Sequence, residues 1–398
     1  MTTPRNEPSN PNYSPDGRPR ARALGIPFDG EPGPLNCITD IPQLSVGHVT
    51  LINGDGELVV GEGPVRTGVT VVLPRGVDGI GRPCTAARYS LNGNGEMTGS
   101  AWVDEVGMVD LPIAITNTHS VGAVHRGIVQ WVAHHRPELA AAWLLPVVAE
   151  TWDGYLNDIN GDHITADHVT QAIESATTEA LHEGSVGGGT GMNCYSFKGG
   201  SGTASRIVRY GSSTYTVAAL VQANFGARHE LRIAGVPLGV ELADDNPIDS
   251  TDWFDRDLAR SVPPGAGSVI VIIATDAPLL PGQCAAMARR VPLGLARTGT
   301  TGGHFSGDLF LALSTGNEGL HSSTFPSGDP TDDDYENLTF IPWGRMDPFF
   351  AAVVHSVEEA VVNALVVNTE MVGRDGHRSP ALPHDRVAEA MRRTYATR

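Results

Sequence analysis

Residues 263–276 read Pro-Pro-Gly-Ala-Gly-Ser-Val-Ile-Val-Ile-Ile-Ala-Thr-Asp, and the rest of the fold is organised around them. Five aliphatic residues follow Ser268, and a run this short and β-branched predicts a strand buried on both faces. The small residues Ala266 and Gly267 leave the peptide bond before Ser268 unshielded and free to adopt a strained geometry. Ser268 is therefore expected to be the first residue of a core strand.

Hydrolysis of the Gly267–Ser268 bond would give Ser268 a free α-amine beside its hydroxyl. An α-amine titrates near pH ~7.7–8.0 and a lysine near ~10.4, so the amine is a built-in proton acceptor for the hydroxyl. The local pattern leaves a plainer alternative open, in which Gly-Ser only closes a loop before a strand.

Composition limits the classes of partner. The 398 residues are enough for a large core, and the 27 basic and 45 acidic side chains give 27 − 45 = −18, which disfavours nucleic acid and anionic membranes as partners. The four cysteines form no Cys-x-x-Cys pair, which fits a reducing compartment better than a disulfide framework or a zinc site. They are Cys37, Cys84, Cys194 and Cys284.

The first 22 residues are polar and rich in proline, asparagine and arginine. They contain no apolar stretch of about 7–15 residues such as a signal peptide needs, and no run in the chain approaches the ~20 residues that cross a bilayer. We therefore expect a cytoplasmic protein with a disordered leader over residues 1–22 and a single domain over residues 23–398.

The hydrophobic pattern predicts an α/β protein in which two sheets are covered by helices. A loop over residues 91–99 is expected at a surface or a pocket rim, and residues 242–265 are expected to form an acidic linker. The expected strands are residues 38–51, 68–74, 112–116, 144–149, 206–210, 215–222, 236–241 and 309–313, and the expected helices are residues 121–134, 165–182, 280–296, 349–368 and 385–395.

Several catalytic classes are disfavoured by the motifs. The chain has no Gly-x-Ser-x-Gly elbow, which disfavours an α/β-hydrolase, and its 14 histidines never form His-Glu-x-x-His or another ligand spacing, which disfavours a catalytic metal. The glycine-rich residues 187–193 are not followed by Gly-Lys-Ser/Thr, so they are expected to shape a pocket rather than bind a nucleotide. No cofactor is implied.

Ser306 and Asp308 form a second candidate site. They lie two residues apart on an extended segment, so their side chains point to one face. A hydroxyl hydrogen-bonded to a carboxylate can orient a nucleophile that lacks a histidine. An ordinary Ser-Gly-Asp turn is the alternative.

Four separated motifs, in order, resemble the self-processing aminopeptidases typified by the L-aminopeptidase/D-esterase and the β-peptidyl aminopeptidases. The likeness covers roughly residues 35–375. The resemblance implies an αββα sandwich of the N-terminal-nucleophile-hydrolase type, cleaved before its nucleophile into chains of residues 1–267 and 268–398. The motifs are Ala-Glu-Thr-Trp-Asp-Gly-Tyr-Leu-Asn-Asp-Ile-Asn-Gly at residues 149–161, Gln-Ala-Asn-Phe-Gly-Ala-Arg at 222–228, Gly-Ser-Val-Ile-Val-Ile-Ile-Ala-Thr-Asp-Ala-Pro at 267–278 and Ser-Gly-Asp-Leu-Phe-Leu-Ala at 306–312.

The resemblance also implies a role for each site residue. Ser268 resembles the nucleophile, Ser306 and Asp308 its hydrogen-bonded relay, Asn224 the side-chain donor of the oxyanion hole, and Glu150 the carboxylate that binds the substrate's free amine. An amide can donate to a developing oxyanion, and a carboxylate pairs with an ammonium, which makes an exopeptidase. Some members carry glutamate where this chain has Asp308, which keeps the charge but shortens the reach.

Alternatives from other classes remain. The ornithine acetyltransferases share this fold type but use a threonine nucleophile, and a non-catalytic ligand-binding protein would never be cleaved. Glu150 has a structural alternative as a cap on the loop that contains Trp152 and Gly154. The resemblance further implies a short peptide or amino-acid amide as substrate and a homo-oligomer of cleaved units. It does not separate L-α-, D- and β-amino acid substrates.

Overall fold

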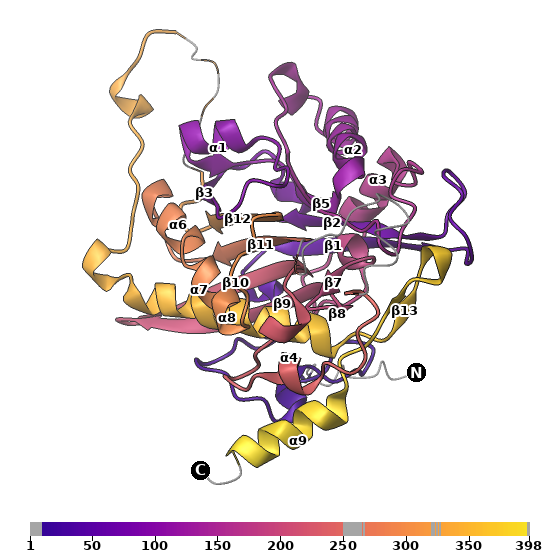
Figure 1. Cartoon of the computed structure of the whole chain (residues 1–398). Helices are drawn as coiled ribbons and strands as arrows, with labels where there is room; N and C mark the ends of the chain where they lie inside the picture. Colours follow the sequence, from indigo (N-terminus) through magenta and orange to yellow (C-terminus); the bar gives the residue numbers. More distant parts are fainter. Residues whose placement is uncertain are drawn as a thin grey trace, which may run out of the picture.

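The computed structural model describes residues 10–249, 265, 267–319, 323, 325 and 328–395. Two β-sheets are stacked face to face, and helices cover the outer face of each sheet (Figure 1). Three separate apolar clusters fill the space between these four layers. The αββα sandwich implied by the sequence is confirmed.

The six-stranded sheet has the order β4-β3-β12-β11-β10-β9. Its centre is β11, which is hydrogen-bonded in parallel to β12 and in antiparallel to β10. The strands are β3 (Cys84–Ser90), β4 (Met108–Val109), β9 (Gly200–Tyr210), β10 (Ser213–Asn224), β11 (Gly267–Thr275) and β12 (Ser306–Ser314).

The residues of β11 alternate between two apolar layers. Val269 and Val271 belong to the cluster under the outer helices, whereas Ile270 and Ile272 belong to the cluster between the sheets. Both faces of the strand are thus buried, as its continuous aliphatic run predicts.

The four-stranded sheet has the order β1-β2-β5-β6, with only the last pair parallel. Its inner face packs on the six-stranded sheet through the shared apolar cluster. The strands are β1 (Ser45–Asn53), β2 (Val65–Leu73), β5 (Ile113–Asn117) and β6 (Val147–Thr151).

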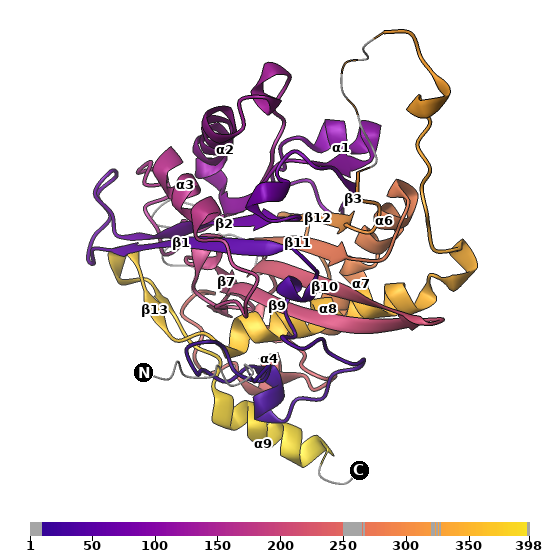
Figure 2. The same ribbon diagram turned by 180° about the vertical axis from the view of Figure 1, so that it is seen from behind.

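Helices α2 (Val121–His135) and α3 (Ala166–Glu174) cover the four-stranded sheet, and α8 (Asp347–Val366) covers the six-stranded sheet (Figure 2). The chain enters α2 through a short 3-10 turn that the Asn117 side chain caps by accepting from the backbone amides of His119 and Ser120. The remaining α-helices of the described residues are α1 (Ser100–Val106), α4 (Leu238–Glu241), α6 (Pro281–Ala288), α7 (Val291–Arg297) and α9 (His384–Tyr395). Two short hairpins pair β7 (Asn193–Cys194) with β8 (Phe197–Lys198) and β13 (Met371–Val372) with β14 (Arg378–Ser379).

Two predicted helices are wrong in extent. The helix expected over residues 165–182 ends at Glu174, because Thr177 then exchanges backbone hydrogen bonds with Val46 at the edge of the four-stranded sheet. The helix expected over residues 280–296 is two helices, α6 and α7. The break precedes Pro292, which lacks the amide hydrogen that would continue the first helix.

Two predicted strands are also wrong. No strand forms over residues 236–241: Ile233 and Val236 exchange backbone hydrogen bonds in a tight turn, and residues 238–241 then form the single helical turn α4. The strand expected to begin at residue 38 begins only at Ser45, after the 3-10 turn Ile38–Asp40.

The prediction of a disordered leader over residues 1–22 is wrong from Asn10 onward. Arg20 is buried, its guanidinium pairs with Glu183 at 2.6 Å, and it also donates to the carbonyls of Asn36 and Thr203. Residues 10–22 are therefore fixed to the body by buried polar contacts that hydropathy alone does not reveal. Residues 1–9, and most of the acidic linker expected over residues 242–265, lie outside the described residues.

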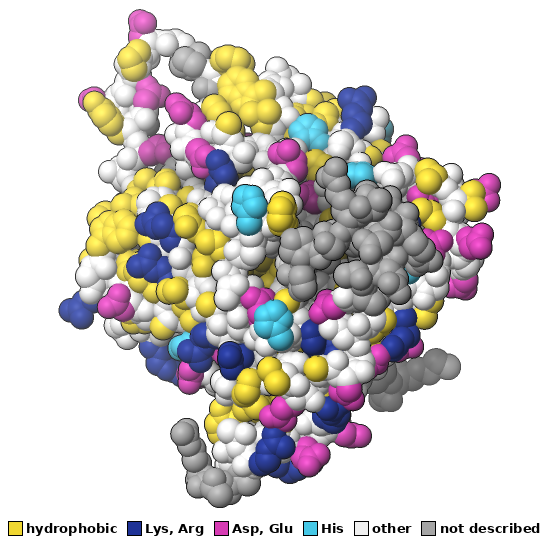
Figure 3. All heavy atoms as spheres, in the orientation of Figure 1, with side chains coloured by type: hydrophobic (Ala, Val, Ile, Leu, Met, Phe, Trp, Pro, Cys, Tyr) yellow, Lys and Arg dark blue, Asp and Glu magenta, His cyan; other side chains and the backbone are white. Residues whose placement is uncertain are grey.

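The surface carries charges of both signs. Acidic and basic side chains are interspersed on the face shown in Figure 3. One helix of the described chain, α8, has the length and composition to cross a membrane, and 78% of its most apolar window is buried inside the protein.

Candidate active site

Three neighbouring strands bring the predicted site residues together. Ser268 at the start of β11 is paired with Asn224 at the end of β10 and with Gly307 at the start of β12. Residues that are directly paired across a sheet point to the same face. The side chains of Ser268 and Asn224 therefore share one face.

That shared face is the inner face of the six-stranded sheet, which packs on the four-stranded sheet. Ser268 lies two residues before Ile270, which belongs to the cluster between the sheets, and side chains two apart on a strand point the same way. Ser268 is only 3% exposed, and its Oγ has no hydrogen-bond partner within the described part of the chain. Buried hydroxyls are normally paired, so the unpaired Oγ of Ser268 has free hydrogen-bonding capacity beside the Asn224 amide.

The amide of Asn224 is held by two backbone groups. Its Oδ1 accepts from the Asn193 amide at 2.9 Å, and its Nδ2 donates to the Trp152 carbonyl at 2.9 Å. Because one partner is a donor and the other an acceptor, the two contacts fix which end of the amide is nitrogen. The second hydrogen of Nδ2 remains for an oxyanion.

Ser306 and Asp308 form the hydrogen bond that their spacing predicts. Ser306 Oγ donates to Asp308 Oδ1 at 2.5 Å, and the loop residue Asn92 donates to Asp308 Oδ2 at 3.0 Å. Burial raises the pKa of Asp308, while the hydrogen bonds from Ser306, Asn92 and the Val269 amide act to lower it.

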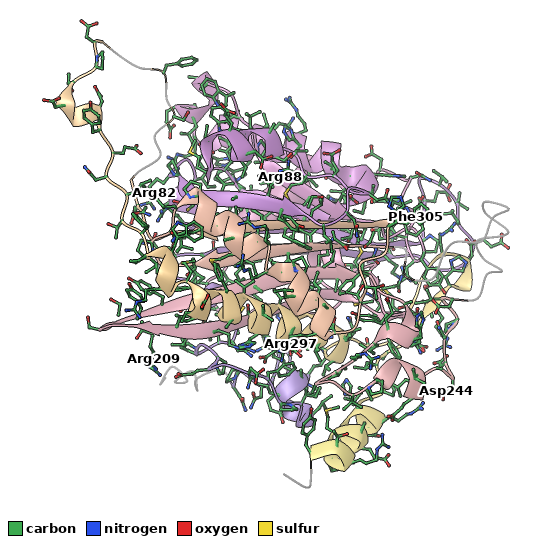
Figure 4. The ribbon with its side chains drawn as sticks, turned by 60° about the vertical axis from the view of Figure 1, so that its left-hand side comes forward. Arg82, Arg88, Arg209, Asp244, Arg297 and Phe305 are labelled. Carbon is green, nitrogen blue, oxygen red and sulfur yellow. The ribbon has the colours of Figure 1, made fainter. Side chains whose placement is uncertain are left out.

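This pair does not lie on the face that carries the Ser268 hydroxyl. Asp308 is paired with Val269, and Ser306 with Gly267, so both side chains point to the opposite face from Ser268. The backbone nitrogen of Ser268 lies in the sheet between the two faces. Residue 305 marks this end of β12 at the surface, where the labelled Phe305 lies 54% exposed (Figure 4).

Glu150 approaches the same place from the other sheet. It lies on β6 and is buried, and its two carboxylate oxygens accept from the Glu96 amide at 2.8 Å and from the Thr118 hydroxyl. Burial raises the pKa of Glu150, and the two hydrogen bonds act to lower it.

Gly95 lies between Glu150 and the start of β12, next to Ser268. A Cβ atom at Gly95 would lie 3.1 Å from Glu150 Oε1 and 3.2 Å from the Cα of Gly307, the strand partner of Ser268. The loop over residues 91–99 thus separates the carboxylate from β12 by the width of one glycine backbone. Residues 93–96 of this loop are exposed, which confirms the surface position that was one of the two expected for it.

The sequence did not single out the residues that hold the site residues in place. Asn92, Thr118 and Asn193 contact Asp308, Glu150 and Asn224 respectively from distant positions in the chain, and no local pattern marks such contacts. The described residues contain no group of three or more histidine, cysteine, aspartate or glutamate side chains arranged to hold a metal.

Comparisons with known proteins show the family. The model of peptidase family S58 matches residues 36–379. The chain is 45% identical over 368 residues to a β-peptidyl aminopeptidase of Sphingosinicella microcystinivorans, covering 92% of this chain and 90% of that protein.

Two similar solved structures are also aminopeptidases. A β-aminopeptidase from a Burkholderia species superposes with a TM-score of 0.83 at 43% identity, covering 94% of this chain and 99% of that one. The L-aminopeptidase D-Ala-esterase/amidase of Ochrobactrum anthropi, described as a variant of the Ntn hydrolase fold, superposes with a TM-score of 0.83 at 40% identity, covering 95% and 99%. These matches favour the peptidase over the acetyltransferase and the non-catalytic alternatives. The chain belongs to peptidase family S58 and is a serine aminopeptidase with an N-terminal-nucleophile hydrolase fold.

Proposed function

We propose that this aminopeptidase cleaves its own chain between Gly267 and Ser268 and then uses Ser268 as its nucleophile. The observation that carries the proposal is the buried, unpaired Oγ of Ser268, on the same face as the Asn224 amide and one peptide bond after Gly267. Maturation and turnover would then use one hydroxyl and one oxyanion donor.

In maturation, Ser268 Oγ attacks the Gly267 carbonyl carbon, and the C–N bond breaks to leave an ester and a free α-amine. Water hydrolyses the ester, which releases the Gly267 carboxylate and restores the hydroxyl. In turnover the same oxygen attacks the substrate carbonyl, the α-amine takes its proton and passes it to the leaving amine, and water then hydrolyses the acyl-enzyme. In each tetrahedral step Asn224 Nδ2 donates to the oxyanion.

The Ser306–Asp308 pair is assigned to the α-amine rather than to the hydroxyl. The pair lies on the opposite face from Ser268 Oγ, but the amine released by cleavage is free to turn toward Ser306. A hydroxyl whose proton is held by a carboxylate can accept from that amine and orient its lone pair toward Oγ.

Glu150 is assigned to the substrate's ammonium. Each carboxylate oxygen can accept more than one hydrogen bond, so the contacts to Glu96 and Thr118 leave room for an ammonium. A free ammonium entering this buried place also stabilises the ionised carboxylate, which burial alone disfavours. This pairing would restrict cleavage to N-terminal residues.

We place β-peptides and amides of β-amino acids among the substrates, because two of the similar proteins are named for β-peptidyl or β-amino substrates. D-Amino acid amides and esters are the second class, after the Ochrobactrum enzyme. The four cysteines are free and buried, which suits the cytoplasm.

Assembly of cleaved units into an oligomer completes the proposal. Residues 328–340 extend away from the body (Figure 1), and exposed aromatic side chains lie on and next to this segment, at Tyr335, Phe340 and Trp343. Burying such side chains against a second copy would remove apolar surface from water. Light scattering that gives the mass of one cleaved unit would refute the oligomer.

A substrate panel tests the activity. The p-nitroanilides of L-alanine, D-alanine and a β-homo residue are assayed side by side, each with a free and an acetylated amine, against wild type and Ser268→Ala. We expect release from at least one free-amine substrate, none from acetylated ones and none by the variant. Turnover by Ser268→Ala would show that another group is the nucleophile.

A further inference from the structure

Lys198 is the only lysine among the 27 basic residues of the chain; every other one is an arginine. It lies on β8, and its side chain is completely buried. A lysine ammonium is a compact charge with three donors, whereas the arginine guanidinium is a planar fork of five donors. A chain that uses arginine everywhere else therefore keeps a compact cation at this one buried position.

The ammonium of Lys198 is bound to backbone carbonyls. Nζ donates to the Met192 carbonyl at 2.7 Å and to the Gly199 carbonyl at 2.8 Å. Among the described residues Lys198 forms no ion pair, and the hydrogen-bond partners of Nζ are these two peptide oxygens.

The peptide group that begins at Met192 makes a second contact. Its N–H, which belongs to Asn193, donates to Asn224 Oδ1 at 2.9 Å. One peptide group thus accepts from Lys198 at its oxygen and donates to Asn224 from its nitrogen. The other end of the same Asn224 amide carries the hydrogen assigned above to the oxyanion.

We propose that Lys198 is a positioning residue for the oxyanion hole, which fixes and polarises the Met192–Asn193 peptide group and, through it, the side-chain amide of Asn224. The inference rests on the proposed function, in which Asn224 is the oxyanion donor. It adds a residue that does not itself touch the substrate.

The physical basis is the polarisability of amides in a low dielectric. A cation at the Met192 oxygen withdraws electron density from the peptide nitrogen, which makes the Asn193 N–H a stronger donor. That bond withdraws density from Asn224 Oδ1 and so strengthens the Nδ2 hydrogens as donors. Chains of hydrogen bonds polarise one another in this way, by roughly 10–30% per bond in condensed phases.

The charged groups around Lys198 are few. Burial lowers the pKa of Lys198 to about 7, while Cys194 and Asp153 act to raise it. Asp153 is itself fully buried, directly after Trp152, whose carbonyl holds Asn224 Nδ2. Lys198 and Asp153 therefore flank the two backbone segments that hold the Asn224 amide.

The test is a double-mutant cycle between Lys198→Met and Asn224→Ala, with each protein incubated until its cleavage is complete. Methionine has a similar volume without charge or donors, and each of the two carbonyls keeps another donor, the Gly199 amide for Met192 and Asn368 Nδ2 for Gly199. If Lys198 acts through Asn224, Lys198→Met lowers kcat about tenfold in the Asn224 background with KM within about twofold, and less than twofold in the Asn224→Ala background. Lys198→Gln serves the same cycle if the methionine variant does not fold.

Asn368→Ala is the matched control. Asn368 Nδ2 also donates to the Gly199 carbonyl, at 2.7 Å, but it does not touch the Met192–Asn193 peptide group. This variant is expected to lower the melting temperature and leave kcat within about twofold of wild type.

Equal losses from the Lys198 substitution in both backgrounds would overturn the proposal. So would a fall in kcat in Asn368→Ala as large as in the Lys198 variant, because it would trace the effect to loosening of the hairpin. An uncleaved wild type, or an Asn224→Ala variant as active as wild type, would instead contradict the proposed function.

Discussion

Glu150 is the one site residue contributed by the four-stranded sheet. Its carboxylate accepts from the Glu96 amide in the loop over residues 91–99, and Gly95 of that loop lies between it and Gly307, the strand partner of Ser268. In the proposed function, a substrate whose amine pairs with Glu150 would direct its carbonyl toward Ser268. The gap between the two sheets would then set how far the amine lies from the scissile bond.

Replacing Glu150 by glutamine tests the ammonium contact. Glutamine keeps the shape but not the charge, so kcat/KM should fall by about 2–3 kcal/mol, the scale of a charge-assisted hydrogen bond. Cleavage at Gly267–Ser268 should persist, because maturation brings no free amine to Glu150. If Glu150 only caps its loop, the variant loses thermal stability and cleavage together, which melting curves beside the kinetics will reveal.

The sequence predicted the candidate site residues that belong to a motif. It did not predict the residues that contact them only in the folded chain. Asn224, Ser268 and the Ser306–Asp308 pair lie on or at the ends of strands whose pairing brings them together. Asn92 and Thr118 contact the site only after the chain has folded. Lys198 did carry a signal, since it is the only lysine in the sequence.

The 3-10 turn η6 (Gly187–Gly189) consists of three buried glycines. It is wedged against strands of both sheets: a Cβ atom at Gly188 would lie 2.3 Å from Gln222 Oε1 and 2.6 Å from the Ile115 carbonyl oxygen. Its role as a spacer between sheets explains the glycine-rich stretch, for which the sequence predicted a pocket-shaping loop.

Gly188→Ala should therefore destabilise the protein by about 1–3 kcal/mol, the usual cost of overpacking. Gly122→Ala is the matched control, because Gly122 lies in α2 and a Cβ atom added there would meet no other atom within 4 Å. Alanine there should stabilise the helix by about 0.5–1 kcal/mol. Chemical denaturation of the three proteins compares these free energies, and equal stability of the two variants would contradict the spacer role.

Elements with a strong pattern were predicted within a few residues. The long helix expected over residues 349–368 is α8, and the last helix expected over residues 385–395 is α9. The errors lie where a tertiary contact or a proline ends an element, as with Thr177 beside Val46 and with Pro292 at the start of α7. Hydrophobic periodicity does not register such contacts.

At the scale of the whole molecule, stability should depend on pH through Asp153. Burial raises the pKa of Asp153 from 3.8 to about 7, so the folded state favours the neutral carboxyl. The folded state binds more protons than the unfolded state between these values, and stability falls as the pH rises through this window. The stabilisation that Asp153 contributes is fully present below its pKa in the unfolded state and is lost as the pH rises above its pKa in the folded state.

Asp153→Asn removes this titration. The melting temperature of wild type minus that of Asp153→Asn should therefore decrease as the pH rises from 5 to 8. A difference between the two proteins that stays constant over that range would show that Asp153 does not change its charge there.

The N-terminal sequence and intact mass of the denatured, purified protein test the central claim most directly. The account predicts two chains, and the smaller should have 398 − 267 = 131 residues and begin Ser-Val-Ile-Val at Ser268. A smaller chain that begins elsewhere, or full aminopeptidase activity from a single intact chain of 398 residues, would contradict the assignment of Ser268 as the N-terminal nucleophile.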